Sequence, residues 1–292
     1  MASLREYRKK IKTIKSTQQI TKAMKMVSAA RLRRAQSRIL SARPFAWKMR
    51  ELLKQLGTET NSSDTSFPHP LLRANKSNKM AILMVTADKG LCGSFNTNLV
   101  RKTLEVIQEN KDKEILFLAA GRKGRDFFKR SNYPIAHEYV HIFNALSYAH
   151  AEIIGQDIIK LYLEKNVAEV RVVYNEFKSV VQQKLTVERL LPIAPPEKLA
   201  AGADFSKTDF LYEPAKEKLL EALLPRYIKS QIFRILLESF AAELGARMAA
   251  MDSATKNAKE LIDLLTLKLN RTRQAMITRE IAELVGGAEA LK

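Results

Sequence analysis

The sequence predicts an α/β protein in which two long terminal helices flank an inserted α/β domain. Residues 226–285 contain no proline and one glycine, Gly245, so all sixty suit a single helix. That helix would be roughly 90 Å long, whereas an average globular helix has about three turns. Residues 2–57 suit a second long helix, and strand and helix patterns alternate between the two. Only these two helices are long enough to cover each other, so we expect a long antiparallel coiled coil.

The N-terminal helix, assigned to residues 1–57, begins with a capping box made by Ser3 and Glu6. Apolar residues then recur at three- and four-residue spacing with phase slips. This thin seam is typical of a coiled coil and too narrow for a globular core. We expect Pro44 to kink the helix or to interrupt its hydrogen bonding, and Gly57 to end it.

The central part, residues 79–212, follows a polar linker at 58–78 and has the alternating pattern of an α/β domain. Short apolar runs suit buried parallel strands with helices between them, in a Rossmann-like arrangement. The strands are expected at 80–86, 115–119 and 170–174, and the helices at about 95–110, 121–131 and 145–165. Residues 180–190 suit an antiparallel edge strand, and 210–212 suit one more short strand.

The C-terminal helix, assigned to residues 213–292, carries a ridge of small side chains. The ridge consists of a main row at four-residue spacing and a second row of small residues beside it, which includes Gly245. Four-residue spacing stacks side chains on one helical face, and a face without bulk lets another helix approach closely. Taken alone, the pattern is explained equally well by alanine as ordinary helix filler. The main row consists of Ala242, Ala246, Ala250, Ala254 and Ala258.

Charge is concentrated at the start of this 292-residue chain, whose formal net charge is +19. Residues 1–50 carry fifteen Lys or Arg against one acid, Glu6, so we expect a polyanionic partner: nucleic acid, an anionic membrane or an acidic protein. Cys92 is the only cysteine, which excludes an internal disulfide. There is neither a signal-peptide pattern nor a run of eighteen apolar residues. We therefore expect any membrane association to be through partners.

No segment has the pattern of a catalytic, cofactor or metal site. Residues 86–94 follow a strand and precede a helix, but their glycines fit neither a Walker A loop nor GxGxxG, so a strand-to-helix turn is the better interpretation. Residues 121–124 suit a surface turn. His137 and His141 lack the glutamate of a zinc-protease motif, and no residue near Cys92 except Asp88 could activate its thiol.

Two classes of function remain open at this point. A nucleic-acid binder would explain the basic N-terminal helix, but the first 44 residues hold one aromatic residue, Tyr7, and no known nucleic-acid-binding signature. The alternative is a structural shaft, basic outside and held against acidic proteins. A phosphate binder would lose affinity steeply with salt, whereas a shaft enclosed in a complex would not detach until very high salt.

Three separated groups of motifs occur in order along the chain. They read QQITKAMKMV at 18–27, TADKGLCG at 86–93 with Asn96, and finally RMAAM at 247–251, ATKNA at 254–258 and NRTRQAMIT at 270–278. Together they resemble the gamma subunit family of F-type ATP synthases, over essentially the full length. The central α/β part agrees with this family in pattern more than in motif.

The resemblance implies a central stalk that works as a rotor shaft. The coiled coil would penetrate a ring of three alpha and three beta subunits, and the α/β domain would bind the epsilon subunit and the c-ring. Ion flow, of protons or sodium, would turn the c-ring, and the asymmetric shaft would drive the beta sites through their conformations. Coupling then requires that each shaft orientation bind the beta conformations differently.

The same resemblance implies several absences and a location. ATP chemistry would occur on the beta subunits, so the chain would have no catalytic residues and no cofactor. It would bind no nucleic acid and form no homo-oligomer. It would be a peripheral subunit on the cytoplasmic face of a bacterial cell membrane, in contact with that membrane only through the c-ring. The single cysteine excludes a thiol switch of the chloroplast kind.

Contact positions along the shaft follow from the matched motifs. Met24 and Arg247 resemble residues that face the moving parts of the beta subunits. Arg273, Gln274 and Thr278 resemble residues that meet the catch loops of the ring. Packing within the coiled coil is the alternative explanation for each of these side chains.

Contact positions outside the coil follow in the same way. The turn from Asp88 to Gly93, which includes Cys92, resembles one near the acidic lever of a beta subunit, and Lys89 could pair with that acid. Beyond Gly286 we expect the helix tip to lie high in the ring, against an apolar sleeve.

Overall fold

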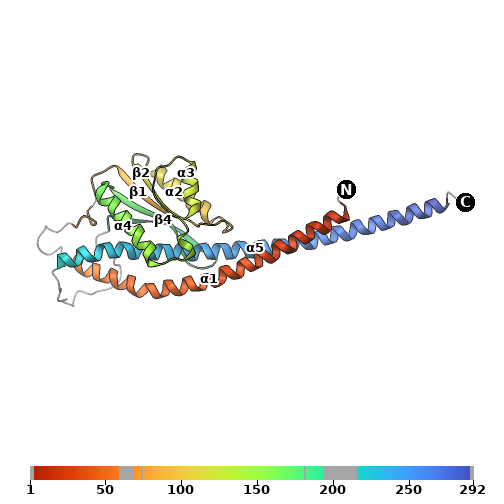
Figure 1. The fold of residues 1–292 in the computed structure, drawn as a ribbon, viewed down its shortest axis with the longest axis horizontal. Helices are drawn as coiled ribbons and strands as arrows, with labels where there is room; N and C mark the ends of the chain where they lie inside the picture. Colours follow the sequence, from red (N-terminus) through yellow and green to blue (C-terminus); the bar gives the residue numbers. More distant parts are fainter. Residues whose placement is uncertain (1–2, 59–68, 74, 181, 194–215, 290–292) are drawn as a thin grey trace. The chain divides into compact units, whose positions relative to one another are not determined.

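A computed structural model of the chain describes residues 3–58, 69–73, 75–180, 182–193 and 216–289 (Figure 1). The chain divides into two compact units. Residues 1–29 and 247–292 form one, which we call the helical unit, and residues 30–246 form the other, the sheet unit. The strand expected at 210–212 and most of the expected linker lie outside the described residues.

A five-stranded sheet in the order β3-β2-β1-β4-β5 forms the centre of the sheet unit. Its strands β1, β2 and β4 are labelled in Figure 1. Its strands are β1 (Lys79–Val85), β2 (Glu114–Ala120), β3 (Ile135–Tyr139), β4 (Glu169–Phe177) and β5 (Gln183–Leu191). The first four strands are parallel, and β5 pairs antiparallel with β4. The expected parallel sheet with an antiparallel edge strand is confirmed, and β3 is an additional strand.

Helices cover both faces of this sheet. They are α2 (Phe95–Glu109), α3 (Arg122–Arg130), the short 3₁₀ helix η2 (Ile142–Asn144) and α4 (Tyr148–Glu164). The central strand β1 shows the two layers, because successive strand residues point to opposite faces. Its residues 81, 83 and 85 pack with α4 and the first part of α5, and its residues 80, 82 and 84 pack with α2 and α3. Both faces of β1 are therefore buried, as is typical of a parallel sheet.

The two long helices are α1 (Leu4–Thr58) and α5 (Lys216–Glu289). The capping box at the start of α1 is present, since Ser3 and Glu6 exchange hydrogen bonds of 3.2 and 3.3 Å. Helix α1 continues through Pro44, and α5 likewise contains Pro225. A proline removes one hydrogen bond of the helical ladder, and here the ladders on either side extend far enough to keep the helix continuous.

Within the helical unit, α1 and α5 run antiparallel and are joined by polar contacts. The hydroxyls of Thr21 and Thr255 lie 2.8 Å apart, and Lys25 Nζ lies 2.6 Å from Asp252 Oδ1. The seam is narrow and includes small and polar residues, as the thin apolar pattern predicts. Its buried members are Thr21, Ser28, Met251, Ala258 and Leu265.

Part of the small-residue ridge of α5 lies in the sheet unit and packs there. Ala241 and Ala242 are fully buried. Ala241 packs with Leu32 of α1, and a Cβ added at Gly245 would lie 3.4 Å from Phe177 at the end of β4. The absence of bulk therefore lets α5 approach both the other long helix and the sheet.

Candidate functional site

The polar contacts of the helical unit fix how α1 meets α5. Thr255 also donates to the Met251 carbonyl at 2.7 Å, so its hydroxyl joins its own helix to Thr21. Asp252 takes hydrogen bonds from Lys25 and Lys256, which lower the pKa of its carboxyl. These contacts are directional and hold the pair of helices in one register.

Large apolar side chains lie exposed on α1 within this unit. Ile20, Met26 and Val27 are each more than half exposed. Met26 lies about 100° from Val27 and about 120° from Ile20 around the helix, and exposed apolar side chains that are scattered singly are common on protein surfaces, so these three alone do not define an interaction surface. The sequence pattern did not separate these residues from those of the seam, because its phase slips leave the facing side undetermined.

The end of α5 exposes nearly all of its side chains. After Leu265, none of the side chains described up to Ala288 is buried. Several large apolar residues lie there in the open, and a Cβ added at Gly286 or Gly287 would touch nothing within 4 Å. These residues are Leu267, Met276, Ile277, Ile281, Leu284 and Val285.

The structure places the predicted shaft residues in two groups. Arg273, Gln274 and Thr278 are exposed on the end of α5 and are available to another chain. Met24 and Arg247 are half-buried, and Arg247 has an interaction within the protein. The side chains of Met24 and Arg247 are therefore partly covered by the protein itself and partly open to solvent.

The predicted turn at residues 88–93 is divided between inward and outward side chains. Asp88 Oδ1 accepts hydrogen bonds from the backbone N–H groups of Arg122 and His141, both at 3.0 Å. Asp88 thus joins the turn after β1 to the start of α3 and to the segment after β3. Because its carboxylate sits at a helix N-terminus, its charge stabilises that helix end.

Cys92 also points inward. Its side chain is buried, and its sulfur lies 3.2 Å from Asn96 Nδ2. Lys89 is exposed, and so is Leu91, which has a φ of 65° and is 64% exposed. A positive φ is uncommon for leucine, and the sequence carries no sign of it. The outward tip of the turn therefore consists of Lys89 and Leu91.

The strand-to-helix turns are packed against each other and leave no room for a phosphate between them. A Cβ at Gly121 would lie 2.1 Å from the Thr86 carbonyl oxygen, and one at Gly124 would lie 2.8 Å from the Thr86 hydroxyl. Gly124 donates its N–H to that hydroxyl at 2.9 Å. The N-terminal amides of α3 are thus used inside the fold, in agreement with a structural turn.

The histidines do not assemble a metal site in the described part of the chain. His137 Nδ1 lies 3.7 Å from Asp157, which accepts a 2.6 Å hydrogen bond from Tyr139. Burial is the main cause of the raised pKa of the Tyr139 hydroxyl, with Asp157 adding to it. No group of three or more possible ligands occurs among the described residues.

The whole chain is similar to known proteins of one kind. The sequence model of the family described as ATP synthase matches residues 3–291. The chain is 45% identical to the ATP synthase gamma chain of Chloroherpeton thalassium, over 100% of this chain and 99% of that protein. It is 46% identical to the ATP synthase gamma chain of Halothermothrix orenii, over 100% of both. The chain belongs to the family of ATP synthase gamma chains.

Solved structures show the same fold. The central stalk and c-ring structure of the Tetrahymena thermophila mitochondrial ATP synthase holds a chain 26% identical to this one. The match has a TM-score of 0.58 and covers 80% of this chain and 99% of that one. A chain of the Euglena gracilis mitochondrial ATP synthase matches with a TM-score of 0.68 at 21% identity. The match covers 99% of this chain and 94% of that one.

These similarities confirm the function expected from the sequence. The chain is a non-catalytic stalk subunit and works as the rotor shaft of an ATP synthase. The described helices include none that is both long and apolar enough to cross a membrane.

Proposed function

We propose that the chain exchanges torque with the catalytic ring through two surfaces of its helical unit. The first is the uncovered end of α5, with Arg273, Gln274 and Thr278. The second lies on the paired part of the helices, at Met24 and Arg247. The observation that carries this proposal is the exposure of nearly all described side chains on the end of α5, large apolar ones included. Such a surface requires a partner that covers it.

In this proposal, further partners bind the sheet unit. The outward pair Lys89 and Leu91 meets an acidic segment of a beta subunit, with Asp88 and Cys92 setting the shape of the turn from inside. The epsilon subunit and the c-ring bind other parts of the α/β domain. The similarity to a chain of a central stalk and c-ring structure supports this arrangement. The chain would then act as a peripheral subunit on the cytoplasmic face of a bacterial membrane.

Matched substitutions on α5 test the first surface. Arg273 and Arg271 are both exposed, but lie about 160° apart around the helix. We expect Arg273→Ala to lower ATP synthesis by the assembled enzyme, whereas Arg271→Ala leaves it nearly unchanged. Equal losses in the two variants, at equal levels of assembled complex, would contradict a directional contact.

A second pair tests the surface on α1. Met24→Lys adds a charge beside the seam, and Met26→Lys adds the same charge two residues away, where the side chain is 59% exposed. We expect Met24→Lys to reduce ion pumping more than ATP hydrolysis, and Met26→Lys to affect the two equally. A parallel fall of pumping and hydrolysis in the Met24→Lys enzyme, with assembly intact, would show that Met24 is a packing residue only.

Co-purification tests the partners themselves. A tagged chain is recovered from cells at high salt, where binding that depends on phosphate charge is lost. Alpha, beta and epsilon subunits are expected in the recovered material. Recovery of the chain without these subunits at high salt, or with nucleic acid in their place at low salt, would contradict the proposed partners.

A further inference from the structure

One arginine of α5 joins this helix to the two strands at the antiparallel edge of the sheet. Arg234 Nη2 donates to both carboxylate oxygens of Glu188 on β5, at 2.9 and 2.8 Å. Its Nη1 donates to the hydroxyl of Tyr174 on β4, at 3.2 Å. Tyr174 in turn donates to Glu188 at 2.9 Å, which closes a ring of three side chains from three elements.

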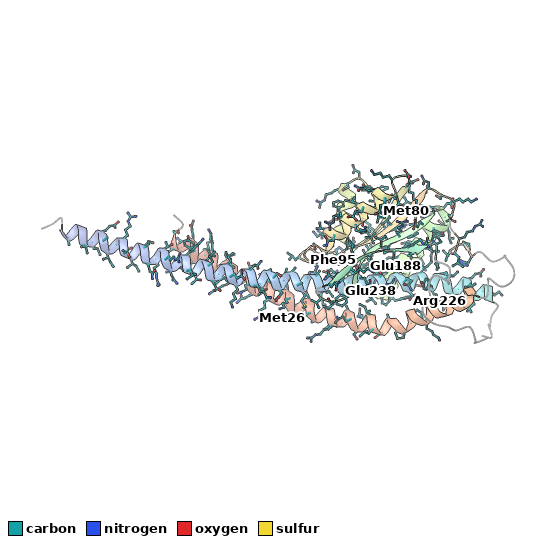
Figure 2. The ribbon with its side chains drawn as sticks, turned by 180° about the vertical axis from the view of Figure 1, so that it is seen from behind. Met26, Met80, Phe95, Glu188, Arg226 and Glu238 are labelled. Carbon is teal, nitrogen blue, oxygen red and sulfur yellow. The ribbon has the colours of Figure 1, made fainter. Side chains whose placement is uncertain are left out.

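The remaining donors of this guanidinium bind its own helix. Nε donates to Gln231 at 2.8 Å, and Nη1 also lies 3.3 Å from Glu238. Glu188 and Glu238, labelled in Figure 2, therefore belong to different elements and share one arginine. The planar fork of an arginine fixes its partners in direction as well as in distance.

The surroundings of this cluster are largely buried. The side chain of Arg234 is 23% exposed and that of Glu238 is 16% exposed. Burial is the main cause of the raised pKa of the Glu238 carboxyl, and Arg234 opposes it. Removing a charged group from water costs free energy, and an apolar cluster of similar volume often stabilises a fold at least as well as a buried ion pair. The value of this network is therefore its geometry more than its contribution to stability.

A second contact holds α5 from another side. Lys229 Nζ lies 2.9 Å from Glu152 on α4, and a Cβ at Gly155 would lie 2.8 Å from the Lys229 side chain. Lys229 and Arg234 are five residues apart, so they lie about 140° apart around the helix. Directional contacts on two sides oppose rotation of α5 about its own axis, in addition to the close packing of the apolar side chains around it.

We propose that Arg234 is a positioning residue for torque transmission: its fork fixes the rotational setting of α5 against β4 and β5. Torque that enters the α/β domain then reaches the shaft helix without slip at this junction. The inference rests on the rotor-shaft function and adds to it the place where domain and helix are locked together. It predicts that Arg234 matters under mechanical load and little when the shaft turns freely.

The test compares substitutions in the assembled enzyme. Arg234→Met removes the fork, and Arg234→Lys keeps the charge but cannot form the bidentate contact. The matched control is Arg171→Met, because Arg171 makes a bidentate contact to Glu169 at 2.8 and 3.1 Å on the same strand β4. Among the described residues of α5, none forms a hydrogen bond or ion pair with Arg171. A bead attached through Lys111→Cys reports twist, since the other cysteine, Cys92, is buried.

Three measurements are made on each variant. They are the angular fluctuation of the bead with the catalytic ring immobilised, the rate of ATP hydrolysis without load, and the rate of ATP synthesis against an imposed ion gradient. Hydrogen exchange of the β5 amides adds a local measure of how often the strand separates from α5.

The proposal expects wider angular fluctuation and lower synthesis for Arg234→Met, with unloaded hydrolysis unchanged. Exchange in β5 should accelerate by at least about tenfold, because Glu188 on β5 and the less exposed Glu238 on α5 both lose their shared cation. Arg234→Lys should fall between Arg234→Met and the unsubstituted chain, and Arg171→Met should leave both fluctuation and synthesis unchanged. If Arg234→Met accelerates exchange but leaves the fluctuation unchanged, Arg234 is a stabilising residue only and the proposal is wrong. If Arg171→Met widens the fluctuation as much, the effect is not specific to the junction and the proposal is also wrong.

Discussion

Replacement of Gly121 by alanine tests how tightly the turns of the α/β domain are packed. Gly121 precedes α3 and has a φ of 101°, a conformation that residues with a Cβ rarely adopt. A Cβ built there would lie 2.1 Å from the Thr86 carbonyl oxygen and 2.7 Å from its carbon. Both atoms are backbone, so no side-chain rotation can relieve the contact.

The cost follows from two separate effects. Backbone strain at such a position amounts to about 1–3 kcal/mol. Relief of the overlap must move Thr86 by about 1 Å, which weakens its 2.8 Å bond to the Ala120 carbonyl and the 2.9 Å bond from Gly124, at about 1 kcal/mol each. We therefore expect Gly121→Ala to lower the free energy of unfolding of the sheet unit by about 3–5 kcal/mol.

Hydrogen exchange of the β1 and β2 amides in the full chain measures this loss as a free energy of opening. Gly90→Ala is the matched control, because a Cβ there meets only the Lys123 side chain, at 3.9 Å. Its expected effect is within about 0.5 kcal/mol. A loss below about 1 kcal/mol for Gly121→Ala would refute the reasoning, since the turn would then be free to rearrange.

Substitutions at three further places have expected outcomes. Asp88→Ala removes the acceptor of two backbone N–H groups and should cost about 2 kcal/mol, whereas Asp88→Asn keeps an acceptor and should cost less; urea unfolding distinguishes them. Gly155→Leu forces bulk against Lys229 and should lower stability by roughly 1–3 kcal/mol, visible as a shift of the urea midpoint with an unchanged slope. Thr21→Val and Thr255→Val should each destabilise by about 1 kcal/mol, and the double variant by less than the total of the two, in thermal unfolding; strict additivity would show that the two hydroxyls do not interact.

Hydrophobic pattern and helix signals were sufficient to predict the architecture except for the edge strand β3. The long helices, the buried runs of β1, β2 and β4, and the alternation of β5 all follow from period and composition. The narrow seam also followed, because few apolar residues are available on α1. The continuation of α1 through Pro44 was not predicted from the sequence. The expectation of a kink or an interruption considered the proline alone and not the helical hydrogen bonds on both sides of it.

The placement of the site residues depended on tertiary structure. The sequence motif grouped Asp88, Lys89 and Cys92 on one turn, and the structure directs only Lys89 outward. Leu91 is also exposed there, and its backbone has a positive φ. A leucine in a sequence gives no indication of such a φ. The partners of Arg234 come from strands β4 and β5, so no spacing along α5 could have indicated its role.

The uncovered end of α5 has a consequence for how the cell must produce this protein. A newly made copy presents six large apolar side chains on the end of α5, and no described residue of the chain buries them. Such a surface attracts other copies of itself as readily as its intended enclosure, so surplus chains would aggregate. The exposed apolar side chains at the end of α5 therefore require that shaft and ring subunits be made in balanced amounts, or that each new chain be bound promptly by its partners.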